Sequence, residues 1–264
     1  MATHLIRECI MKYSTSIPAL LCLFISGIGF AETKPNILLI VSEDNGPELG
    51  CYGDRFARTP YLDQLAEDGI LFRRAVVPQA GCSQSGASFL TGLYPHQHGQ
   101  FGLATWGFRM YRADTPNLPR SLREAGYRTG IIGKLHINPV SAFPFDMHEI
   151  TSANFQRTQL SDYARYATEF MGAGEKPFFL SVNYPDAHRP WIARVDGLPK
   201  NPQTKDDVQV MDYMGIDSPE FRELAADHYN CMSRLDSLVG DRCLPFRSQS
   251  SVCVDASAAA LSAV

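Results

Sequence analysis

The chain has 264 residues, of which 45% are apolar and 20% charged, and this composition is typical of a globular protein with a sizeable core. Its 24 basic and 28 acidic residues give a net charge of -4 without a basic run, which argues against a nucleic-acid-binding protein. The sequence contains no internal repeat and no low-complexity tract.

Residues 1–31 are predicted to be a secretory signal peptide. Basic residues precede an apolar stretch over 17–30, and small residues at 29 and 31 suit signal peptidase. The stretch is shorter than the roughly 20 residues of a membrane-spanning helix. A buried N-terminal helix or an uncleaved anchor is the alternative. We therefore expect export, with the mature chain secreted or periplasmic and without a stable membrane span.

Continuous apolar runs and helix-start signals predict the first elements. Residues 36–41 form a short apolar run, which is typical of a parallel strand buried on both faces. The Thr-Pro pair at 59–60 predicts the start of a helix over 61–68. The apolar residues within 70–77 predict a second strand.

Strands and helices continue to alternate through residue 240. The expected elements are a helix from Thr115 to Ala125, a strand over 128–132, a helix over 163–171, a strand over 177–183 and a helix over 218–240. This alternation implies an α/β fold, with a mostly parallel sheet sandwiched by helices, over one domain spanning 34–240. The tail 241–264 has no amphipathic period and is interpreted as a poorly structured terminus or as the product of a frameshift.

Seven cysteines allow disulfides in an exported protein but do not specify them. Cys9 and Cys22 belong to the predicted signal peptide, and Cys82 belongs to a motif described below. The spacing of the remaining four matches no zinc-binding pattern, and nothing in the sequence pairs them: Cys51, Cys231, Cys243 and Cys253.

Polar residues follow the predicted strands, where sites form in open α/β sheets. Glu43 and Asp44 come directly after the first strand, and such a pair can chelate a hard cation such as Ca²⁺ or can simply form a solvated turn. Cys82 lies just before a helix-like stretch over 85–90, whose amino end suits a tetrahedral anion. Each of these features, taken alone, could also have a purely structural role.

The stretch from Cys82 to Gly92 resembles the signature C-x-P-S-R-x-x-x-x-T-G of the type I sulfatases, which belong to the alkaline-phosphatase superfamily. Other family elements follow the same order: the acidic pair, a Gly-Lys-x-His loop with Lys134 and His136, and an Asp-Ala-His-Arg segment with His188. The likeness covers about 34–240. The stretches 129–134, 143–146 and 176–180 are similar to the heparan N-sulfatase branch.

The resemblance implies a chemistry for these residues. In the family the cysteine is oxidised to formylglycine, whose hydrated aldehyde attacks sulfur, so Cys82 would be the nucleophile precursor. Glu43, Asp44 and Cys82 would hold one Ca²⁺, Lys134 and His136 would stabilise charge, and His188 would protonate the leaving group. The implied partner is a sulfated carbohydrate, carrying a sulfate ester or an N-sulfate group.

Several departures from the family pattern bear on activity. Gln84 and Gly86 replace the proline and arginine that the formylglycine-generating machinery usually recognises, and Glu43 replaces an aspartate. A second metal-ligand pair, a further sulfate-binding lysine and the C-terminal subdomain are not recognisable. The alternatives are therefore an inactive, truncated remnant or a sulfated-glycan-binding protein. A phosphoryl-transfer relative using Zn²⁺ is the weakest interpretation, because Cys82 stands where those proteins have Ser or Thr.

Overall fold

The structure is a computed structural model that describes residues 34–243 and 251–257, and all structural statements concern these residues. The predicted signal peptide over 1–31 lies outside them. Five parallel strands form one sheet in the order β3-β2-β4-β1-β5. Their bounds are Asn36–Ser42 for β1, Arg128–Gly133 for β2, Met147–Glu149 for β3, Phe178–Asn183 for β4 and Ser251–Ser257 for β5. The predicted α/β fold with a parallel sheet is confirmed.

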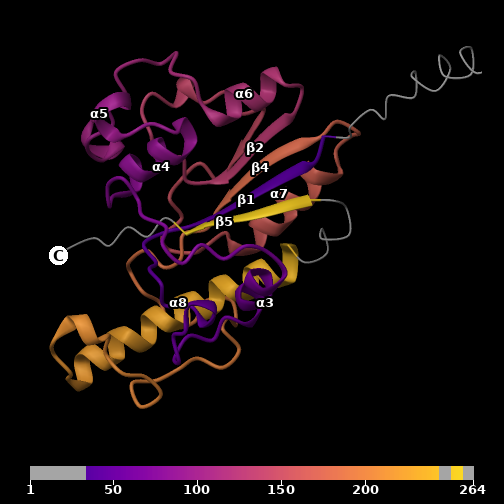
Figure 1. The fold of residues 1–264 in the computed structure, drawn as a ribbon. Helices are drawn as coiled ribbons and strands as arrows, with labels where there is room; N and C mark the ends of the chain where they lie inside the picture. The colour runs from indigo at the N-terminus through magenta and orange to yellow at the C-terminus, as the bar shows by residue number, and fades with distance from the viewer. Residues whose placement is uncertain (1–33, 244–250, 258–264) are drawn as a thin grey trace, which may run out of the picture. The chain divides into compact units, whose positions relative to one another are not determined.

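Helices cover both faces of the sheet (Figure 1). On one face, Leu38 and Ile40 of β1 join a core cluster with residues of α3, α7 and α8; on the other, Leu39 and Val41 pack towards α4 and α6. The α-helices are α3 (Pro60–Asp68), α4 (Cys82–Thr91), α5 (Pro95–His98), α6 (Leu118–Glu124), α7 (Leu160–Gly172) and α8 (Pro219–Cys243). Short 3₁₀ turns span Gly50–Tyr52, Ala104–Trp106, Val140–Ala142 and Asp212–Met214.

The strand register brings the chain segments of the site together. Val41 of β1 lies opposite Asn183 of β4, and Asn183 lies opposite Gly133 of β2. The carboxyl ends of these three strands therefore meet at one edge of the sheet, as parallel pairing requires. The residues that follow each strand emerge side by side there.

Three helices begin at other residues than predicted, and a capping side chain explains one of these shifts. The helix expected from Thr115 begins only at Leu118, because the Asn117 side chain accepts a hydrogen bond from Arg120 N at 3.1 Å and thereby caps it. Helix α4 begins at Cys82 itself rather than after it, so that residue occupies the first helical turn. Helix α3 starts at Pro60, one residue before the predicted span.

One further prediction is wrong. Residues 70–77 form no strand: Ile70, Phe72 and Val76 are 83%, 70% and 89% exposed, because no strand of the described chain pairs with this run. The tail also contains regular structure, since residues 251–257 form β5 and pair with β1 from Asn36 to Ser42. The other tail residues beyond 243 lie outside the described part of the chain. No described helix combines the length and apolarity that crossing a membrane requires.

Candidate functional site

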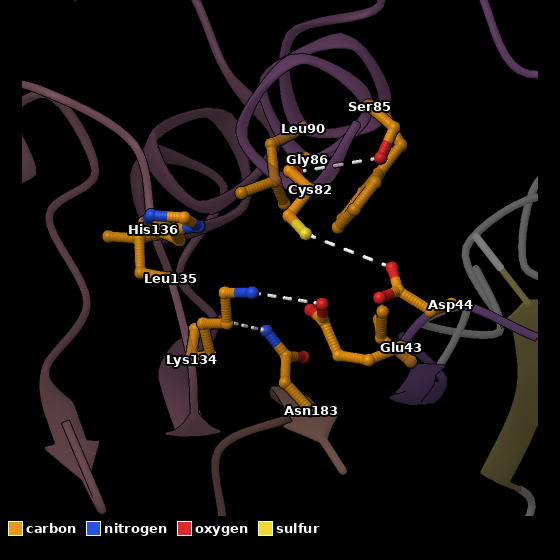
Figure 2. A pocket seen from close by; sticks show the side chains of 12 residues that line it. Glu43, Asp44, Cys82, Ser85, Gly86, Leu90, Lys134, Leu135, His136 and Asn183 are labelled. Atoms are coloured by element: carbon orange, nitrogen blue, oxygen red, sulfur yellow. Dashed lines mark hydrogen bonds and ion pairs between the residues drawn. The ribbon is translucent and has the colours of Figure 1, made fainter. Parts of the chain in front are cut away.

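Five of the six predicted site residues line one pocket at the carboxyl edge of the sheet (Figure 2). The space among its side chains is about 420 Å³, part of it open to solvent. Its walls come from the ends of β1, β2 and β4 and from the first turns of α4. The predicted residues in it are Glu43, Asp44, Cys82, Lys134 and His136, and the sixth, His188, contacts Asp44 from the loop after β4.

The acidic pair is fixed by its backbone. Glu43 N donates to Asp186 O at 2.9 Å, and Ala187 N donates to Glu43 O at 2.6 Å, so the loop after β4 continues the pairing of β1. Asp44 has a φ of 50°, a left-handed conformation that turns the chain into the pocket. Burial raises the pKa of Asp44 and the neighbouring Glu43 adds to this, while His188 opposes it. Negative charge is thus concentrated here.

Cys82 points into the pocket from the first turn of α4 (Figure 2). Its Sγ lies 3.8 Å from Asp44 Oδ1. Burial, together with the charge of Glu43, raises the pKa of the Cys82 thiol to about 12. The thiol is consequently protonated at neutral pH, and the unmodified side chain is a poor nucleophile in this surrounding.

Lys134 forms a buried ion pair with Glu43, its Nζ lying 2.9 Å from Oε2. Although burial opposes the charge, Glu43 and Cys82 raise the pKa of Lys134, so the ammonium is retained. Asn183 Nδ2 donates to Lys134 O at 2.6 Å and fixes this loop. Gly133 precedes it with a φ of 97°, and a Cβ there would lie 2.2 Å from Asn183 O, so only glycine fits.

His136 has an unsatisfied imidazole. Both ring nitrogens are buried and neither has a hydrogen-bond partner among the described residues. Burial, with the neighbouring Lys134 charge, lowers the pKa of His136 to about 4, so the ring is neutral at pH 7. Buried polar atoms normally find partners, and an open pair on a pocket wall therefore indicates a place for a polar ligand or water.

His188 is held over the acidic pair by stacking. Its Nε2 lies 3.5 Å from Asp44 Oδ2, and its ring stacks on Phe155 with 3.8 Å between centroids. Lys134 Nζ lies 4.8 Å from the centroid of the same Phe155 ring. One aromatic side chain thus contacts both the histidine and the lysine of the site.

A buried ion network supports the loop that carries His188. Asp186 accepts hydrogen bonds from Arg157 Nε at 2.8 Å and from Arg234 Nη2 at 2.7 Å, and all three side chains are fully buried. Arg157 also donates to His188 O and to Pro190 O. The two guanidinium groups thereby tie the loop to α8 and to the segment before α7.

Asp44, Cys82 and His188 form a cluster that could hold a metal ion, since one ligand atom from each lies within 4.8 Å of the others. The predicted set was Glu43, Asp44 and Cys82. The structure places Glu43 in the same pocket, but its carboxylate contacts Lys134.

Sequence reasoning missed three supporting residues. Asn183 is the polar residue that ends a predicted strand, a signal that was available. Phe155 and Arg157 lie in an irregular segment before α7, where no periodicity or motif marks them. Their importance follows only from their contacts with His188.

Comparison with known proteins identifies the family. The sulfatase family model matches residues 35–241. The chain belongs to the sulfatase family. It is 32% identical to human N-sulphoglucosamine sulphohydrolase, covering 86% of this chain and 50% of the relative, and 29% identical to mouse iduronate 2-sulfatase, covering 59% and 35%. The chain thus spans half or less of the length of these sulfatases.

The fold comparison agrees with this assignment. A Bacteroides fragilis protein described as a sulfatase superposes with a TM-score of 0.62 at 19% identity, over 87% of this chain and 63% of that one. The sulfatase fold therefore accounts for the parallel sheet and its covering helices.

Proposed function

We propose that this sulfatase-family chain catalyses the metal-assisted hydrolysis of a sulfate ester or N-sulfate group on a carbohydrate. N-sulfated glucosamine is the first substrate to test. The observation that carries the proposal is the convergence of Cys82, Lys134 and His136 on one pocket beside the acidic pair. The name of the human relative, N-sulphoglucosamine sulphohydrolase, supports the choice of sugar. The predicted signal peptide supports export, to the cell exterior or the periplasm.

Four of the predicted site residues have separate roles in this reaction. Formylglycine at position 82, once formed, supplies a hydrated aldehyde as the nucleophile towards sulfur. Lys134 offsets the charge of the sulfate, aided by the amino end of α4. The open ring nitrogens of His136 hydrogen-bond the anion or the nucleophile. His188 gives a proton to the leaving oxygen or nitrogen as its bond to sulfur breaks.

The described residues fit a calcium ion only in part. Ca²⁺ takes about six to eight oxygen ligands, and Glu43 and Asp44 supply carboxylates at the pocket wall. Conversion of Cys82 would add oxygens and remove a sulfur, which favours this hard cation. The ion would polarise the sulfate oxygens. The remaining ligands would have to come from water, substrate or residues outside the described part of the chain.

A second candidate function is binding of sulfated glycans without turnover. Gly86 lines the pocket at the position of the family arginine, so the site lacks a cation that usually offsets negative charge. Lys134, His136 and the helix terminus would still attract a sulfate group. This candidate needs no change at Cys82.

Both candidates can be tested on the full chain, co-expressed with a formylglycine-generating enzyme. Mass spectrometry of the Cys82 peptide measures conversion, and release of sulfate from an aryl sulfate and from N-sulfated glucosamine measures turnover. We expect turnover to follow conversion, to vanish in Cys82→Ala and to persist in Cys51→Ala, whose thiol does not line the pocket. Converted, folded, metal-loaded protein without turnover would refute the enzyme, and calorimetric binding of a sulfated glycan would then support the second candidate.

A further inference from the structure

The unmodified pocket holds three donors of different chemical kinds on three separate elements. Cys82 Sγ lies 3.8 Å from Asp44 Oδ1, His188 Nε2 lies 3.5 Å from Asp44 Oδ2, and one donor of each residue lies within 4.8 Å of the others. All three side chains are partly buried rather than spread over an open surface. Thiol, imidazole and carboxylate are each ordinary metal ligands.

This donor set suits a borderline transition metal rather than calcium. Zn²⁺ is bound tetrahedrally by Cys, His and Asp at about 2.0 to 2.3 Å, and ligands at such distances lie roughly 3.3 to 3.8 Å apart. The separations from Asp44 are of that order, 3.8 Å from Oδ1 to Cys82 Sγ and 3.5 Å from Oδ2 to His188 Nε2. The three ligand atoms lie within 4.8 Å of one another, so closure on one ion requires a small shift of these side chains. Ca²⁺ prefers oxygen, so a sulfur and a nitrogen among three donors count against it.

We propose that the chain with unconverted Cys82 binds one Zn²⁺ through Cys82, Asp44 and His188, leaving a fourth position open to the pocket. The site would be specific to the thiol state. Conversion of Cys82 to formylglycine removes the sulfur and with it the preference for zinc.

The surroundings prepare the ligands for such an ion. Lys134 holds Glu43 at 2.9 Å, which leaves Asp44 as the carboxylate available to the ion and neutralises the ammonium that would otherwise repel it. Stacking on Phe155 fixes the plane of His188, and backbone bonds of Glu43 fix the chain before Asp44. Thiolate and carboxylate charges together balance a divalent ion, and the thiol proton is released on binding.

Zinc binding would have a consequence for the cysteine itself. A coordinated sulfur is shielded from alkylating reagents and from enzymes that must reach it. Zinc and formylglycine formation would therefore compete for position 82. This consequence is independent of whether the converted chain is an active sulfatase, because it concerns the unconverted form.

Cobalt substitution tests the proposal. The full chain is produced without a formylglycine-generating enzyme, shown by mass spectrometry to carry the Cys82 thiol, and stripped with a chelator. Added Co²⁺ is expected to give a thiolate-to-cobalt charge-transfer band that one equivalent of Zn²⁺ abolishes and excess Ca²⁺ does not.

Variants separate this site from other thiols and from misfolding. Cys82→Ser should abolish the band, while Asp44→Asn and His188→Gln keep the thiol and should weaken Zn²⁺ binding by at least about 10- to 100-fold. Cys51→Ala is the matched control and should leave the band unchanged; circular dichroism reports folding. A folded thiol-form chain without the band, or a band that survives Cys82→Ser, would overturn the proposal. Loss of sulfatase turnover alone would not bear on it.

Discussion

Position 86 sets the charge balance of the pocket. Gly86 lies in α4, one turn after Cys82, and brings no charge to the pocket. Among the described pocket-lining residues, Lys134 is the cation that neighbours the carboxylates of Glu43 and Asp44. A Cβ built at residue 86 would lie 3.6 Å from Ile137 Cδ1, an ordinary contact, so the first atom of a side chain fits. The backbone there is helical and needs no glycine.

Gly86→Arg should therefore raise turnover. A preorganised charge at an active site is typically worth on the order of 100- to 1,000-fold in rate, and we expect at least a tenfold gain in sulfate release per converted chain. Gly86→Met is the matched control, because it has similar length but no charge. Formylglycine content is measured in parallel. Equal rates for the two variants at equal conversion would show that charge at this position is unimportant.

At the scale of elements, a buried carboxylate joins two helices. Asp236 of α8 is 2% exposed and accepts a hydrogen bond from Leu62 N, in the first turn of α3, at 2.8 Å. Burial raises the pKa of Asp236 to about 7, although the backbone amides of Leu62 and Tyr61 oppose this. An unfolded aspartate has a pKa near 3.9, so the folded state binds more proton between about pH 4 and pH 7. Stability from this group accordingly falls as pH rises through that window.

Asp236→Asn should remove this pH dependence. The amide oxygen can still accept from Leu62 N, and it cannot ionise. We expect the variant to exceed the parent in free energy of unfolding at pH 8, by on the order of 4 kcal/mol, with the difference falling to roughly 1.5 kcal/mol at pH 5 and to zero only below about pH 4. Urea unfolding at the two pH values measures it. Asp162→Asn, on an exposed face of α7, is the control and should show no such trend. A difference independent of pH would contradict the assignment.

Elements with a clear physical signature were predictable from sequence, and those defined by partners were not. The positions of β1 and β4 could be predicted from their apolar runs, because parallel strands buried on both faces are apolar along nearly their whole length. The equally apolar run over 70–77 has no partner strand and stays exposed. Conversely, β5 forms against β1 in a stretch without a clear pattern, since pairing supplies what local sequence does not.

The site follows the same rule. Because parallel strands end at one edge, the residues after β1 and β2 could be expected to meet, and Glu43 and Lys134 do so at 2.9 Å. Cys82 was expected after a strand that does not exist, yet it reaches the pocket as the first residue of α4. The stacking of Phe155 on His188 depends on a segment without regular structure, so no sequence pattern predicts this contact.

At the scale of the whole described molecule, Asp186 links the sheet, helix α8, the irregular segment before α7 and the pocket. Its backbone carbonyl accepts from Glu43 N, and its carboxylate accepts from Arg157 and Arg234. Arg234 belongs to α8 and also donates to Ile192 O at 2.7 Å, while Arg157 contacts the carbonyl of His188. Any change at this carboxylate is thus transmitted to both the core and the site.

Asp186→Asn should destabilise the fold and loosen His188 together. Removing one charge from a buried network leaves the guanidinium groups uncompensated, and such a loss costs about 3 to 5 kcal/mol. We expect that drop in urea unfolding, whereas Asp162→Asn, which breaks an exposed pair with Arg165, should change stability by less than about 1 kcal/mol. Under conditions where the variant is still folded, His188 should also exchange between orientations, seen as broadened imidazole resonances by NMR. A loss below about 1 kcal/mol with sharp resonances would mean that the two arginines find other partners, and that the loop after β4 is held by its backbone bonds to Glu43 alone.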